Sequence, residues 1–86
     1  MILISVHDIK AETWSPPVCM PTKASAVRDF ANACAKSGTV MAQCPQDFEL
    51  WQVGEWHDNG ADAAPHLHSF EQFVCLDHGA DYVRKN

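Results

Sequence analysis

A chain of 86 residues makes one small domain, which buries only about 60–65% of the surface of its unfolded chain. Its 47% hydrophobic and 20% charged residues are typical of a globular protein and exclude intrinsic disorder. Eleven acidic against six basic residues give a net charge of −5, which argues against nucleic-acid binding through the overall field but leaves room for a local basic cluster. Because so small a domain has a thin stability margin, we expect it to oligomerise, as a homodimer.

The first predicted element is a strand over residues 2–8. Ile2, Ile4 and Val6 stand at every second position, the period of a strand with one apolar face. This region has no basic segment, and its apolar run is too short for a signal peptide or a membrane span. We therefore expect a cytosolic protein with no membrane partner.

A connector and a helix follow. The run Trp14-Ser15-Pro16-Pro17 favours an extended segment that cannot join a central sheet ladder, so we expect it to lie across the sheet. Thr22 suits a helix N-cap, and Gly38 suits the end of the same helix. Apolar residues recur at helical spacing between them: Ala24, Val27, Phe30, Ala31 and Cys34. The spacing predicts a helix over residues 23–36.

The middle of the chain predicts a turn, a strand and a hairpin. Pro45-Gln46-Asp47 suits a short helical turn, and residues 49–56 are rich in strand formers on both faces. Asp58-Asn59-Gly60 suits a tight hairpin turn because Asn and Gly tolerate positive φ. A returning strand should begin near Ala61.

The last segment has two interpretations. Ser69-Phe70-Glu71-Gln72 matches a capping box and favours a short helix, whereas Phe73-Val74-Cys75-Leu76 would also make a buried strand. We favour the helix. The sequence thus predicts an α+β fold in a single domain over residues 1–86, of β-α-β-β order, with one main helix packed on an antiparallel sheet and a short C-terminal element.

Motifs for catalysis and cofactors are missing from the sequence. The four glycines are isolated, and the spacing of Cys, His and Asp singles out no nucleophile and base, so we expect neither an enzyme nor a cofactor. The four cysteines are read as small buried thiols. His66-x-His68, completed by His57, His78 or a cysteine, is a weak metal pattern, and we favour packed or solvent-facing histidines and predict no metal site.

Two residue types could contact DNA. Tryptophan rings stack on unpaired bases at about 1–3 kcal/mol per base, although core packing or a subunit interface is their commoner use. Basic side chains could contact phosphates or simply form a solvated face, and four phosphate contacts would give a log–log salt slope near −3 for a single strand. The candidates are Lys10, Lys23, Arg28, Arg84, Lys85, Trp14, Trp51 and Trp56.

Residues 44–60, together with Pro16-Pro17 and the Ala26-Val27-Arg28-Asp29-Phe30 segment, resemble the small nonstructural protein of gokushoviruses and related microviruses, the single-stranded-DNA bacteriophages. The resemblance implies a protein of the bacterial host cytoplasm that binds single-stranded DNA and assists genome replication or the switch to DNA packaging. It implies no catalytic residue. The competing hypothesis, which the net charge favours, is an adaptor that engages the phage replication initiator, a procapsid or a host factor without contacting DNA.

Overall fold

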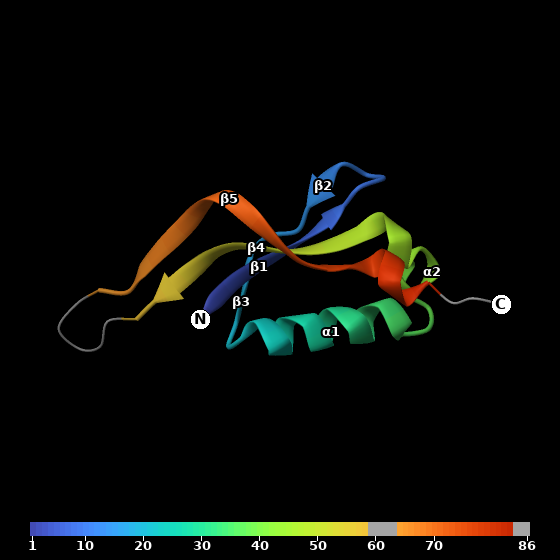
Figure 1. The fold of residues 1–86 in the computed structure, drawn as a ribbon, viewed down its shortest axis with the longest axis horizontal. Coiled ribbons are helices and arrows are strands. Elements are labelled where there is room, and N and C mark those ends of the chain that lie inside the picture. Colours follow the sequence, from blue (N-terminus) through green and yellow to red (C-terminus); the bar gives the residue numbers. More distant parts are fainter. Residues whose placement is uncertain (59–63, 84–86) are drawn as a thin grey trace.

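The computed structural model describes residues 1–58 and 64–83, and Figure 1 shows their arrangement. The α+β class, with one main helix and an antiparallel sheet, is confirmed. In chain order the elements are β1 (Ile2–Asp8), β2 (Thr13–Trp14), β3 (Val18–Met20), α1 (Lys23–Ala35), α2 (Val40–Gln43), the 3₁₀ turn η1 (Pro45–Asp47), β4 (Phe48–His57), β5 (His66–His78) and the 3₁₀ turn η2 (Gly79–Tyr82).

The sheet has the order β2-β1-β4-β5, with β3 also paired to β1, and every pairing is antiparallel. Strands β1 and β4 are therefore interior. Strand β1 pairs with β4 along one edge and with the short strands β2 and β3 along the other, and Pro16-Pro17 lies between these two short strands. The prolines stay out of the central ladder, as predicted, because a proline nitrogen has no hydrogen to donate to it.

The predicted helix is confirmed as α1, which ends one residue early, at Ala35. Thr22 caps it: the Thr22 hydroxyl accepts from the Ser25 backbone N–H at 3.1 Å, and the Ser25 hydroxyl lies 3.2 Å from the Thr22 backbone nitrogen, which donates to it. The buried side chains are Ala26, Phe30 and Cys34, one turn apart. Ala24, which the spacing placed on the apolar side, is exposed because the buried stripe runs through Ala26 instead.

The core lies between α1 and one face of the sheet. Leu50 and Phe48 of β4 pack there against Phe30, and Leu50 is fully buried. The apolar face predicted for the first strand contributes Ile4 and Val6, which stay partly buried against this cluster. Figure 1 shows α1 beneath one half of the sheet, while the β4–β5 hairpin extends well beyond the helix. The molecule is correspondingly long, with extents of 55 × 22 × 18 Å.

The short helix favoured for the last segment is wrong, because residues 66–78 form β5 and the alternative of a strand is correct. Pairing with β4 satisfies the backbone over a long stretch, whereas a short isolated helix is marginal in water. The strand is not buried as that alternative assumed: Phe73 and Val74 are exposed on the edge of the sheet. The predicted hairpin turn at Asn59 and Gly60 and the return near Ala61 lie outside the described residues.

All four cysteines are free thiols. Cys34 is buried in the core as predicted, Cys44 and Cys75 are partly buried, and Cys19 is exposed because β3 lies at the edge of the sheet. The short helical turn predicted at residues 45–47 is confirmed as the 3₁₀ turn η1, and the strand predicted over residues 49–56 is confirmed as β4. None of the helices in the described part of the chain has the length and apolar character needed to cross a bilayer.

Candidate nucleic-acid interface and polar cluster on the open sheet face

The sheet face turned away from α1 carries the candidate site, and we call it the open face. Residues directly opposite one another in antiparallel strands point to the same side. Ser5 pairs with Trp51, and Trp51 pairs in turn with Cys75 on β5, so these three share a face. Leu50, the neighbour of Trp51, points into the core under α1. The open face is therefore the side of Trp51.

Aromatic rings gather on this face around Trp14. Its ring stacks on His7, with centroids 4.2 Å apart and an interplanar angle of 12°. The edges of Trp51 and Phe73 meet it at centroid distances of 5.9 and 5.5 Å. Trp14 and Phe73 each remain 43% exposed. They border a groove of about 260 Å³ that crosses β1, β2, β4 and β5, and we call it the aromatic groove; its lining residues are Ser5, Trp14, Ser15, Pro17, Val53, Ser69 and Phe73.

Local hydrogen bonds fix the β1–β2 hairpin that presents Trp14. The buried Ser5 hydroxyl donates to the Ser15 carbonyl at 2.6 Å, and the Ser15 hydroxyl accepts from the Val6 backbone N–H at 2.8 Å. The register places Trp14 opposite His7. The hydroxyls of Ser5 and Ser15, which line the aromatic groove, are thus hydrogen-bonded within the hairpin, which leaves the aromatic walls as the available surface.

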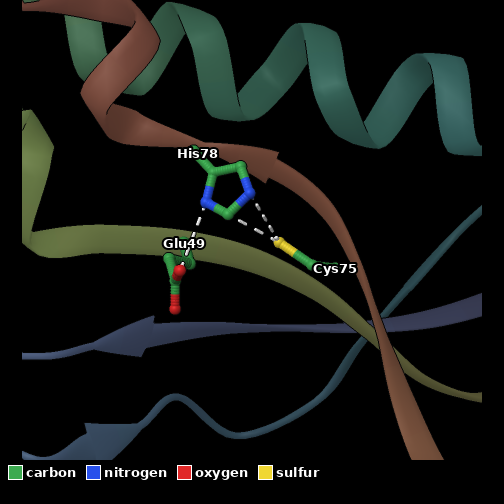
Figure 2. Close-up of side chains that lie close together, drawn as sticks. All are labelled: Glu49, Cys75 and His78. Carbon is green, nitrogen blue, oxygen red and sulfur yellow. Dashed lines mark hydrogen bonds and ion pairs between the residues drawn. The ribbon is translucent and has the colours of Figure 1, made fainter.

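Beside the groove lies a polar cluster centred on Glu49. Figure 2 shows the His78 ring between the Glu49 carboxylate of β4 and the Cys75 thiol of β5. Nδ1 of His78 is 3.2 Å from Glu49 Oε2, and the Cys75 sulfur is 3.6 Å from Nε2 and 4.0 Å from Nδ1. The other carboxylate oxygen, Oε1, accepts a hydrogen bond from Trp51 Nε1 at 3.3 Å and lies 3.4 Å from His7 Nδ1.

This cluster does not have the geometry of an activated nucleophile. The Cys75 sulfur is almost equally far from both ring nitrogens of His78, so it lies along the lone pair of neither. Burial raises the pKa of the Cys75 thiol; the hydrogen bond to the Asp77 carbonyl offsets part of this rise, and the charges of Glu49 and Asp77 add to it. A nucleophilic cysteine requires the opposite shift, since the thiolate is the reactive form.

The structure separates the residues that the sequence offered as DNA contacts. Trp14 of β2 and Trp51 of β4 meet on the open face, and Lys10 lies in the loop between β1 and β2. Lys23 and Arg28 are exposed on α1, on the other side of the sheet. Trp56 lies towards the far end of β4, half-buried. Arg84 and Lys85 lie outside the described residues.

Of the histidines in the weak metal pattern, His57, His66 and His68 lie apart from the polar cluster, whereas His78 belongs to it. His66 stacks on His57 with centroids 5.0 Å apart, and the ring of His68 meets that of Phe70. Within residues 1–58 and 64–83, the group that brings metal-ligand atoms together is Glu49, Cys75 and His78. Cys75 and His78 are three residues apart on β5, but Glu49 comes from β4, so spacing along the chain does not bring the three together.

Comparison with known families decides the affiliation. A family model described as phage ORF5 protein matches residues 1–82. The chain belongs to the phage ORF5 protein family. The chain is accordingly a bacteriophage protein, as the resemblance in its sequence indicated. Comparisons with curated protein sequences and with solved structures gave no significant match.

Two residues at the aromatic groove are missing from the predicted DNA contacts: His7, which stacks on Trp14, and Phe73, which lines the groove. His7 was treated only as part of a strand, and Phe73 was assigned to a helix or a buried strand. The sequence does hold a signal for Phe73. It follows Glu71 and Gln72, whose polar side chains prevent burial of both faces, and this pattern is typical of a strand with one buried face.

Proposed function

We propose that this phage protein binds single-stranded DNA without catalysis, and that unpaired bases stack in the aromatic groove. The observation that carries the proposal is the pair of rings, Trp14 and Phe73, each 43% exposed on a sheet face that no helix covers within the described residues. Sheet faces with exposed aromatic rings are a recurrent platform for unpaired bases, because every base offers a π-face to stack on.

The dimensions of the groove favour single strands. Its volume of about 260 Å³ is below the roughly 300–1,000 Å³ of a pocket for a drug-sized ligand and suits one planar ring system at a time. A base paired in a duplex has both faces occupied by its stacked neighbours and cannot enter. A strand that runs across the sheet from β2 to β5 would place successive bases on Trp14 and Phe73.

The placement of charge predicts that stacking dominates over phosphate contact. Lys10 is the described basic residue on the same β1–β2 hairpin as Trp14, while Lys23 and Arg28 lie on the far side of the sheet. One phosphate contact per groove gives a log–log salt slope of about −0.7, whereas contacts by four basic residues would give about −3. The salt slope therefore reports whether the basic residues of α1 take part in DNA binding.

Membership of a phage protein family supports a role during infection. We propose that the protein works in the bacterial host cytoplasm as a microvirus nonstructural protein, in genome replication or in the switch to packaging. A homodimer would present two aromatic grooves on one particle, which raises the effective concentration of the second groove along one strand.

The test is fluorescence anisotropy of a labelled 30-mer of single-stranded DNA at 50 and 200 mM salt, with duplex competitor. We expect Trp14→Ala and Phe73→Ala each to weaken binding by about 5- to 150-fold, the equivalent of about 1–3 kcal/mol per stacked base. Trp14→Phe should restore most of the affinity. Val40→Ala is the matched control, since Val40 is exposed on α2, away from the groove.

Two results would contradict the groove as the binding site. Unchanged affinity in Trp14→Ala would do so directly. Loss of binding in Lys23→Glu/Arg28→Glu together with a steep salt slope would move the site to α1, where the sequence analysis also placed contacts.

A second function is favoured by the charge of the chain. With a net charge of −5 and an apolar groove beside Glu49, the same face suits an aliphatic or aromatic segment of a partner protein. In that case the protein is an adaptor for a replication or assembly factor. Failure of the 30-mer to bind at 50 mM salt would support the adaptor over DNA binding.

A further inference from the structure

The polar cluster beside the aromatic groove combines three different metal-binding groups. We propose that Glu49, Cys75 and His78 form a binding site for a zinc ion on the open face. Their ligand atoms, a carboxylate oxygen, the thiol sulfur and a ring nitrogen, all lie within 4.8 Å of one another. The inference does not depend on DNA binding, since the ion would link β4 to β5 whichever partner the groove accepts.

Two of the three distances between ligand atoms are close to those of a tetrahedral site, and the third, from the Cys75 sulfur to the Glu49 carboxylate, is below 4.8 Å. Zinc binds sulfur at about 2.3 Å and nitrogen or oxygen at about 2.0–2.2 Å, which holds an S and N ligand pair about 3.6 Å apart and an N and O pair about 3.4 Å apart. The Cys75 sulfur lies 4.0 Å from Nδ1 of His78, and Nδ1 lies 3.2 Å from Glu49 Oε2. The His78 side chain is 56% exposed, so its ring can turn to direct Nδ1 at the ion.

The surroundings of Glu49 hold it in position for this role. Trp51 Nε1 and His7 Nδ1 both engage Oε1, which leaves Oε2 directed at His78. Partners on the outer side of a ligating carboxylate orient it and are a regular feature of metal sites. Trp51 and His7 also contact Trp14, so the metal site and the aromatic groove share their supporting residues.

The charges favour a divalent cation of the zinc type. Glu49 and the Cys75 thiolate together neutralise two positive charges, and His78 binds as the neutral imidazole. Binding releases the Cys75 thiol proton to solvent, since the thiolate is the ligand. Sulfur and nitrogen ligands select zinc over magnesium or calcium, which require oxygen. Three protein ligands leave a fourth position, open to water, on the exposed side of His78.

The first test is a titration of the full chain with Co²⁺, which reports its ligands by colour. We expect one ion per chain, visible d–d bands of a tetrahedral site and a near-ultraviolet sulfur-to-cobalt charge-transfer band, all removed by Zn²⁺. Cys75→Ser should abolish the charge-transfer band, and His78→Ala and Glu49→Gln should each weaken binding at least tenfold. Cys19→Ser and His57→Ala are the matched controls, because they remove an exposed thiol and a member of the His57–His66 pair.

A second measurement needs no variant and therefore no assumption about folding. Zn²⁺ should slow alkylation of Cys75 by iodoacetamide at least tenfold, a chelator should restore the rate, and the rate at Cys19 should not change. The proposal is overturned if cobalt binds without a charge-transfer band, if Cys19→Ser or His57→Ala abolishes binding, or if Zn²⁺ leaves the alkylation of Cys75 unaffected.

Discussion

Single side chains decide how the end of the chain is attached to the core. The Tyr82 hydroxyl donates to Asp77 Oδ2 at 2.5 Å, and its ring meets Phe30 of α1 edge-on at 6.3 Å. Gly79, at the start of η2, is so close to the Pro45 and Phe48 carbonyls that no β-carbon fits there. The hydrogen bond therefore links η2 to β5, the ring contact places it against α1, and Gly79 allows it to lie close to η1 and β4.

Titration of Tyr82 tests this attachment. The hydrogen bond to Asp77, followed by burial, raises the pKa of Tyr82 from 10 to about 12. Because the protonated phenol is the stabilised form, its contribution is complete below pH 10 and is lost as the pH rises towards 12. Tyr82 is the only tyrosine, so tyrosinate absorbance reads its titration directly.

We expect Tyr82→Phe to lower the free energy of unfolding by about 1 kcal/mol at neutral pH, as for the loss of one hydrogen bond. The variant should also flatten the loss of stability between pH 10 and 12, measured by urea unfolding at several pH values. A wild-type Tyr82 that titrates near pH 10 would contradict the hydrogen bond to Asp77.

Elements were predictable where their signals are local. Thr22 and Ser25 define the start of α1 within four residues, and the Trp51 and Val53 alternation defines β4. The prediction for the last segment was wrong because it relied on the capping pattern of residues 69–72. That pattern starts no helix when β4 offers the segment a row of backbone hydrogen bonds. The polar cluster could not be predicted for the same reason. Glu49 and His78 meet through the register of β4 and β5, which residue spacing along the chain does not encode.

The capping box of α1 should account for a measurable share of stability. Thr22→Ala removes the acceptor for the Ser25 backbone N–H, and we expect it to lower the free energy of unfolding by about 1 kcal/mol in urea unfolding. Thr22→Ser keeps that acceptor and is the control. Equal stability of the two variants would show that α1 is held by Phe30 and its neighbours alone.

At the scale of the whole molecule, the main feature is the paired end of β4 and start of β5, residues 54–57 and 66–69, which we call the arm. It projects beyond α1, as Figure 1 shows, and a two-stranded hairpin without further packing is marginal in water. Trp56 and Leu67 lie opposite each other on the arm, and Leu67 is 59% exposed. Strand β5 also has no neighbour on its outer edge among the described residues.

These features lead us to expect that a second copy covers the arm and forms the homodimer. Leu67→Lys places a charge at that contact, and we expect it to weaken dimerisation at least tenfold. Light scattering during size-exclusion chromatography should show a shift from about twice the 9.5 kDa chain mass to the monomer mass. Val40→Lys, at a more exposed apolar residue on α2, should leave the dimer intact. The aromatic groove is built within one chain, so the monomeric Leu67→Lys variant should keep its stacking contacts. It should bind a long DNA strand more weakly, because one groove then acts without the other. A wild-type protein that runs as a monomer would place the stability of the arm within the single chain and remove the dimer from the proposed function.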